Sequence, residues 1–110
     1  MKRYKWSDYQ IAEWHKRTFP DCDYVAQMCK LNEEIHEAYA EEGKNYQRWI
    51  EEMADVSIAV AALDMRFQRK IGQVVNCYLR GLPEAYKIME ARDAKMDINT
   101  QRIWEGNHHV

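Results

Sequence analysis

Chain-breaking residues and strand patterns are scarce in this sequence of 110 residues. Only four glycines and two prolines interrupt it, and no alternation of apolar and polar residues competes with the helical spacing of the apolar ones. The chain also lacks an internal repeat, a linker and a low-complexity segment. We therefore expect an all-α protein with a single domain over residues 1–110 and one modest core.

Further absences bear on location and partners. The three cysteines, Cys22, Cys29 and Cys77, form no CxxC pair, so we expect neither a disulfide framework nor a structural zinc site. The basic N-terminus lacks the apolar run of a signal peptide, and no stretch is long enough to span a bilayer. We expect a cytoplasmic protein without a membrane partner. A net charge of −2 and the lack of a basic block argue against nucleic acid as a partner.

Five helices are expected from the apolar spacing and the stop signals. We place them at about residues 7–17, 22–42, 46–67, 69–80 and 84–96, with an extended tail from Asp97. The short turn after Gly43 makes the second and third helices antiparallel neighbours in a four-helix-type bundle. One stripe of the second helix carries Val25, Met28, Cys29, Asn32, Ile35 and Tyr39. The fourth helix is expected to turn Ile71, Val74, Val75 and Tyr78 inward.

Two acidic segments on the neighbouring helices are the most informative part of the chain. They read EEIHE at residues 33–37 and EMAD at residues 52–55. Because a helix turns by about 100° per residue, each segment places two carboxylates on one face, and the hairpin brings the two pairs together. Four such carboxylates repel one another and form an oxygen-rich site that suits Mg²⁺ or Mn²⁺. The four are Glu34, Glu37, Glu52 and Asp55.

The third helix gives a second indication of a cation. From Val56 to Leu63 it is almost entirely apolar, so we expect this segment to be buried on most faces. Asp55 lies at its edge, and no Lys or Arg lies one turn away on the same helix. An unpaired carboxylate there would cost several kcal/mol. A metal ion would neutralise it.

The pattern EExxE, a spacer of fourteen residues, and ExxD on antiparallel helices resembles the MazG-like all-α nucleoside triphosphate pyrophosphohydrolases. The resemblance extends upstream to Trp14 and Phe19-Pro20. Downstream, the segment from Lys95 to Trp104 is similar to the tails of phage and bacterial members described as dATP/dGTP pyrophosphohydrolase-like. About 90 residues are covered, and residues 69–83 are not placed by the resemblance.

The resemblance implies hydrolysis of a (deoxy)nucleoside triphosphate to the monophosphate and pyrophosphate, with Mg²⁺ as cofactor and Mn²⁺ as a substitute. It implies metal ligation by Glu34, Glu37, Glu52 and Asp55, with Glu33 as the catalytic residue that orients or deprotonates water. The expected triphosphate contacts are Lys95, Asn99 and Arg102, with Arg92 and Lys87 as alternatives. Candidates for stacking on the base are Trp14, Phe19 and Trp49, although Trp49 fits the core better.

Other functions remain open at this stage. A dUTPase-like or phosphoribosyl-ATP pyrophosphohydrolase-like enzyme would share the carboxylate-bound Mg²⁺ and select another nucleotide. A non-catalytic helical module would use the bundle for oligomerisation. Di-iron chemistry is disfavoured, because Glu33 and His36 have the Glu-x-x-His spacing but the second acidic segment has no histidine. We expect a homodimer or homotetramer, since helices of this length leave apolar faces that one small chain cannot cover.

Overall fold

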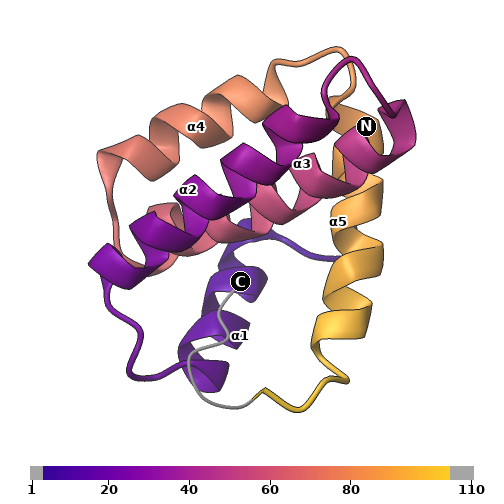
Figure 1. Ribbon diagram of the computed structural model, residues 1–110. Helices are drawn as coiled ribbons and strands as arrows, with labels where there is room; N and C mark the ends of the chain where they lie inside the picture. Colours follow the sequence, from indigo (N-terminus) through magenta and orange to yellow (C-terminus); the bar gives the residue numbers. More distant parts are fainter. Residues whose placement is uncertain (1–3, 105–110) are drawn as a thin grey trace.

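The computed structural model describes residues 4–104, which form helices and no strand (Figure 1). The elements are α1 (Asp8–Thr18), α2 (Tyr24–Glu41), α3 (Tyr46–Ala61), the π-helical turn η1 (Ala62–Arg66), α4 (Lys70–Arg80) and α5 (Ala85–Asn99). The expected all-α class is confirmed. Together α3 and η1 span residues 46–66, which corresponds to the expected third helix. The expectation of an extended tail from Asp97 is wrong at its start, because no glycine or proline lies between Ala85 and Asn99 and α5 continues to Asn99. Residues 105–110 of the expected tail lie outside the described part of the chain.

Polar side chains fix where the first three helices begin. Ser7 and Gln10 form a capping box at α1, in which each side chain bonds to the backbone of the other residue. Asp23 accepts a hydrogen bond at the start of α2, and Asn45 does the same at α3. Gly43 has φ of 75°, which lets the chain turn tightly between these two helices. The hairpin is therefore specified by local sequence.

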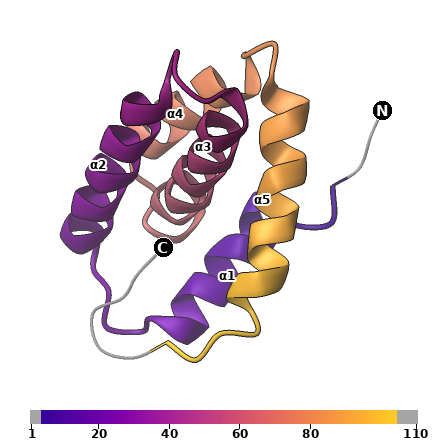
Figure 2. The same cartoon turned by 45° about the vertical axis from the view of Figure 1, so that its right-hand side comes forward.

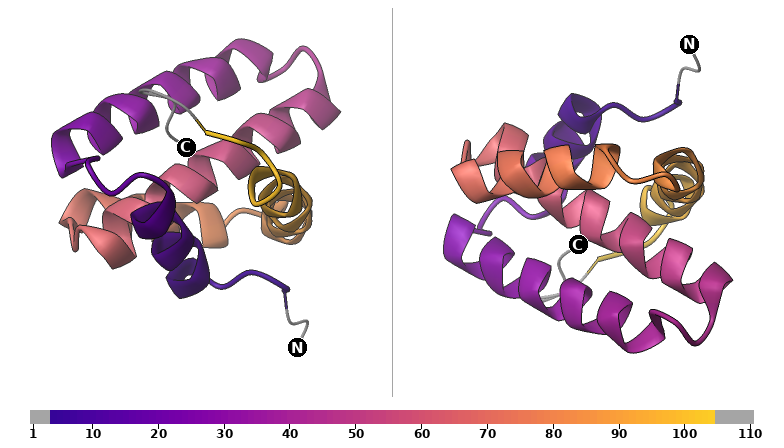
Figure 3. Two further views of the ribbon diagram at one scale, coloured as in Figure 1. Left: turned by 90° about the horizontal axis from the view of Figure 1, so that it is seen from below. Right: turned by 90° about the horizontal axis from the view of Figure 1, so that it is seen from above.

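Helix α3 lies at the centre of the molecule. It packs against α2 on one side and α5 on the other (Figure 2), and α2 and α4 flank it in the view from above (Figure 3). Its segment from Val56 to Ala61 is fully buried, as the apolar run predicted. No helix within residues 4–104 combines the length and apolar character needed to cross a membrane.

A buried ion pair ties the N-terminal part of the chain to α5. The Arg92 side chain is almost fully buried and its Nη1 donates to Asp8 Oδ1 at 2.6 Å and to Ser57 Oγ at 3.1 Å. Asn76 and Arg80 of α4 donate to the other Asp8 oxygen. Burial alone would raise the pKa of Asp8, but the hydrogen bonds from Asn76 and Arg92 and the positive charges outweigh burial and lower it. Arg92 is thus a structural residue.

Helix α4 is turned differently from the sequence prediction. Ile71, Val74 and Tyr78 are 46%, 67% and 64% exposed, so the expectation that they point inward is wrong. The cause is a close approach at Gly72, where a Cβ atom would lie 2.6 Å from the backbone nitrogen of Asp64 in η1. The face that is buried instead carries Gly72, Asn76 and Leu79, with Val75 half-buried beside it.

A candidate metal centre beside a cleft

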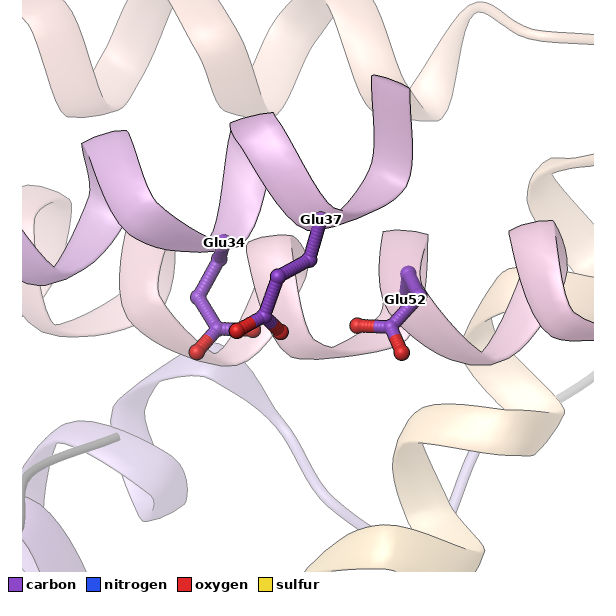
Figure 4. A group of neighbouring side chains, drawn as sticks. All are labelled: Glu34, Glu37 and Glu52. Atoms are coloured by element: carbon purple, nitrogen blue, oxygen red, sulfur yellow. The ribbon is translucent and has the colours of Figure 1, made fainter. Parts of the chain in front are cut away.

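Three carboxylates converge on the side of the α2–α3 hairpin that faces α1 and α5. Glu34 and Glu37 extend from α2 alongside Glu52 from α3 (Figure 4). One oxygen of each lies within 4.8 Å of the others. The spacing of three residues within α2 and the tight turn after Gly43 produce this arrangement. The structure therefore brings together three of the four residues that the sequence suggested as metal ligands.

Asp55, the fourth, lines the same region but has a protein partner. Its Oδ2 accepts a hydrogen bond from Lys95 Nζ of α5 at 3.1 Å. The argument that Asp55 needs a metal for neutralisation is therefore wrong, because the neutralising cation comes from another helix. Burial raises the pKa of Asp55 above its ordinary value, and Lys95 opposes that rise.

Two carboxylates of this cluster, Glu34 and Glu52, have a raised pKa and hold their protons more tightly than isolated carboxylates do. Burial raises the pKa of Glu52 to about 7, with further contributions from its hydrogen bond to Glu37 and from the negative charge of Asp55. Burial also raises the pKa of Glu34, although Lys30 acts in the opposite direction. Burial, rather than repulsion between the carboxylates, is thus the main cause of both raised pKa values.

Two oxygens of the cluster are buried without a hydrogen-bond partner among residues 4–104. They are Glu34 Oε2 and Glu52 Oε2. The other oxygen of Glu34 accepts from Lys30 Nζ at 2.9 Å, and the Glu34 side chain is only 7% exposed. A buried anionic oxygen without a partner is costly. Hard oxygen donors in this number are what Mg²⁺ and Mn²⁺ take, so the residues fit such an ion.

A cleft of about 990 Å³ runs along the acidic cluster. One wall is the acidic face of α2 with Asp55, and a second wall comes from α5 and the segment after it. The loop at residues 18–23 closes one end. The cleft brings the predicted phosphate contacts Lys95, Asn99 and Arg102 to the same space as Glu33, Glu34, Glu37 and Asp55.

These polar residues differ in how freely they can meet a ligand. Glu33 has a side chain that is 68% exposed at the rim, 3.9 Å from Lys30. Asn99 is buried and its amide faces the sulfur of Met96 at 3.8 Å. Arg102 is exposed, with its guanidinium 4.2 Å from the ring centre of Trp104. The alternatives Arg92 and Lys87 do not line the cleft, because Arg92 is bound to Asp8 and Lys87 contacts Tyr46.

Aromatic rings form the apolar end of the cleft. Phe19 and Trp104 both line it, with ring centres 5.4 Å apart. Trp14 packs behind them edge-on, 5.7 Å from Phe19, and is buried in the core without lining the cleft. Trp49 packs against the other core cluster, in agreement with the expectation that it belongs to the core rather than to a base-binding site. Trp104 is thus the aromatic side chain that the sequence analysis missed as a candidate for base contact.

The loop at residues 18–23 is held by Arg66 of η1. Its guanidinium donates to the carbonyl oxygens of Phe19, Pro20 and Cys22 at 3.0, 3.3 and 3.2 Å. No sequence signal pointed to this role, because Arg66 lies more than 40 residues from the loop. Lys30, in contrast, stands one helical turn before Glu34, and that spacing could have predicted their ion pair.

Comparisons with known proteins identify no relative of this chain. No family model matches the chain, and neither a curated protein nor a solved structure is significantly similar to it. The interpretation of the site therefore depends on its residues and their geometry.

Proposed function

We propose that this protein is a Mg²⁺-dependent hydrolase of the MazG-like type, a helical bundle that cleaves a (deoxy)nucleoside triphosphate to the monophosphate and pyrophosphate. One observation carries the proposal. Glu34, Glu37 and Glu52 place oxygens within 4.8 Å of one another, beside a cleft that also contains Lys95 and Arg102. An acidic cation site next to basic side chains suits a ligand that is itself an anion bound through metal ions.

The carboxylates would hold the metal. Glu34, Glu37 and Glu52 supply oxygens on one face, and Asp55 can join them when Lys95 turns to a phosphate. Mg²⁺ bound there would neutralise phosphate charge and lower the pKa of a coordinated water. Mn²⁺, which accepts the same oxygen ligands, would serve as a substitute.

The remaining residues would bind and orient the substrate. Lys95 and Arg102 offer positive charge to the phosphates, and Asn99 offers an amide donor close to them. Phe19 and Trp104 offer apolar rings against which a base can stack. Glu33, exposed at the rim, is free to accept a proton from the attacking water or to orient it.

Two parts of the proposal concern the setting of the reaction. A triphosphate substrate and Mg²⁺ are both abundant in the cytoplasm, where we place the enzyme. We also propose that it acts as a homodimer or homotetramer, because several apolar side chains of α2 and α4 are exposed in the single chain.

The test is release of pyrophosphate from a panel of ribo- and deoxyribonucleoside triphosphates with Mg²⁺. We expect Glu34→Gln and Glu52→Gln to abolish turnover while remaining folded. Glu51→Gln is the matched control, because Glu51 is an exposed neighbour that lies outside the cleft. Orthophosphate as the first product would refute the assigned bond, and a panel without turnover but with tight Mg²⁺ binding would favour the non-catalytic module. With dUTP and phosphoribosyl-ATP included beside this panel, a dUTPase-like or phosphoribosyl-ATP-specific enzyme would show itself by the substrate that is cleaved.

A further inference from the structure

Helix α2 carries an apolar seam on the face opposite its carboxylates. Its members follow one another at alternating intervals of three and four residues, which is the spacing of a coiled-coil seam. They are Val25, Met28, Asn32, Ile35 and Tyr39, and all are exposed in the single chain. Tyr39 is 75% exposed and Val25 is 53% exposed. A helix that already buries Leu31 and Ala38 against its neighbours thus has a second apolar face that no other part of residues 4–104 covers.

Helix α4 adds a second exposed stripe made of Ile71, Val74 and Tyr78. The two helices flank α3 (Figure 3), and the Arg69 guanidinium before α4 lies 3.6 Å from the ring centre of Tyr24 at the start of α2. Their beginnings are therefore close together.

The α2 seam and the α4 stripe both point away from the cleft. The carboxylates of α2 face α1 and α5 (Figure 4), and its seam lies about half a turn around the helix from them. On α4, Asn76 and Arg80 reach Asp8 of α1, and the stripe lies more than about 100° around the helix from these two residues. The seam and the stripe thus both face away from α1, on two helices that flank α3 (Figure 3).

The extent and composition of this surface favour a protein partner. The seven apolar side chains of the seam and the stripe are 37% to 75% exposed. For side chains of this size that is on the order of several hundred Å², the scale of the roughly 800 Å² per partner that a stable interface buries. Neither the seam nor the stripe contains a charged residue. A membrane surface fits poorly, because α2 carries four glutamates and a single lysine, which anionic lipids would repel.

Asn32 indicates that the partner is a second copy. It is the one polar member of the seam and lies at the middle of α2. A single Asn at a core position of a coiled-coil seam is a known device for fixing register, and its amide can both donate to and accept from an identical amide. In a two-fold dimer the same surface meets itself, so such a residue finds its partner in the other copy.

We propose that two copies of this chain pack together through the α2 seam and the α4 stripe, about a two-fold axis, with both clefts open on the outer sides. The proposal is independent of the chemistry at the carboxylates. It names the contact surface of the homo-oligomer that the proposed function includes. Because its test uses no activity measurement, its failure would leave the proposed nucleotide hydrolysis untouched.

Sedimentation equilibrium of the full chain tests the surface. We expect the wild type to have the mass of a dimer or of an even-numbered assembly at micromolar concentration. Ile35→Glu should shift it to the monomer, because a charge would be buried in the seam. Tyr9→Glu is the matched control, since Tyr9 is 60% exposed on α1 and outside the surface. A wild type that is monomeric throughout, or an Ile35→Glu assembly as large as the wild type, would overturn the proposal.

Hydroxyl-radical labelling of the wild type gives an answer even if Ile35→Glu fails to fold. In the single chain Tyr39 and Tyr78 are at least as exposed as Tyr9 and Tyr86, at 75% and 64% against 60% and 52%. In the dimer we expect Tyr39 and Tyr78 to be labelled roughly fivefold less than the other two, because an interface core excludes water. Equal labelling of all four tyrosines would contradict the proposed contact.

Discussion

Replacing Glu52 by Gln should make the metal-free protein more stable, and the gain should depend on pH. The pKa of Glu52 is raised to about 7 in the folded chain, chiefly by burial and then by its hydrogen bond to Glu37 and the charge of Asp55. Its ordinary value is 4.5. Between these two values the folded chain holds a proton that the unfolded chain has released, so stability falls as pH rises through this interval. Gln cannot ionise and removes this loss.

The size of the effect follows from the two pKa values. Each pH unit between them corresponds to about 1.4 kcal/mol, which would give about 3 kcal/mol for a fully buried group. Glu52 is only partly buried, and solvent screening reduces the expected gain to about 1–2 kcal/mol at pH 8. Near pH 5 the folded wild type is protonated at this position, so the variant should differ little from it.

Mg²⁺ should reverse the order of stability. Binding to the folded state alone stabilises the wild type by an amount that grows with the logarithm of ion concentration. Glu52→Gln lacks one of the three converging carboxylates and should gain much less from the ion. The variant should thus be the more stable protein in EDTA and the less stable one at millimolar Mg²⁺.

Urea denaturation at pH 5 and pH 8, with EDTA or with Mg²⁺, measures all four conditions. Glu51→Gln serves as the control, because it removes a charge from the same helix on an exposed site. A loss of stability for Glu52→Gln in EDTA at pH 8 would refute the reasoning. It would show that the hydrogen bond between Glu52 and Glu37 stabilises the fold more than their repulsion destabilises it.

Three further predictions concern other parts of the molecule. Asp8→Asn should lower the free energy of unfolding by about 3–5 kcal/mol in urea denaturation, because it leaves Arg92 buried without its counter-ion, and Mg²⁺ affinity should be unchanged. Gly72→Ala should cost more than about 2 kcal/mol by the same measurement, whereas Gly81→Ala, whose Cβ would lie 3.4 Å from the nearest atom, should cost under about 1 kcal/mol. Lys95→Met should raise the KM for the triphosphate about tenfold or more while calorimetry with Mg²⁺ alone shows equal or tighter binding, because a competing cation has been removed.

Local sequence was sufficient to predict the helices and the hairpin. Ser7 and Gln10 fixed the first cap, and Gly43 marked the turn that makes α2 and α3 antiparallel. The apolar run after Asp55 marked the buried segment of α3. Each of these signals acts within a few residues, which is the range over which helix periodicity and capping operate.

The orientation of α4 depended on a contact that periodicity cannot show. Its most apolar side is exposed, because the helix approaches η1 through Gly72 and cannot turn Ile71 or Tyr78 inward at the same time. Hydrophobic periodicity indicates which residues share a face. It does not indicate whether that face meets the same chain or another one.

The two sides of the cleft also differ in how far their residues could be predicted from the sequence. The acidic cluster beside the cleft comes from neighbouring helices joined by a short turn, so sequence spacing alone brought Glu34, Glu37 and Glu52 together, although Glu52 itself does not line the cleft. The basic wall depends on α5, which is positioned by residues far away in the chain. Besides the Asp8–Arg92 pair, the backbone of Lys5 and Trp6 donates to Asp93, and the Trp6 indole donates to Asp97.

These long-range bonds explain why the sequence predicted that the carboxylates would lie together but did not predict the ion pair between Asp55 and Lys95. Asp55 and Lys95 are 40 residues apart, and no periodicity links them. Their ion pair brings a cation into the acidic site and at the same time places at its edge the side chain that we propose as a phosphate contact. A triphosphate that displaces Lys95 from Asp55 would release this carboxylate for the metal at the moment when the phosphates need it. Substrate and metal would then strengthen each other's binding, as linkage between two sites requires.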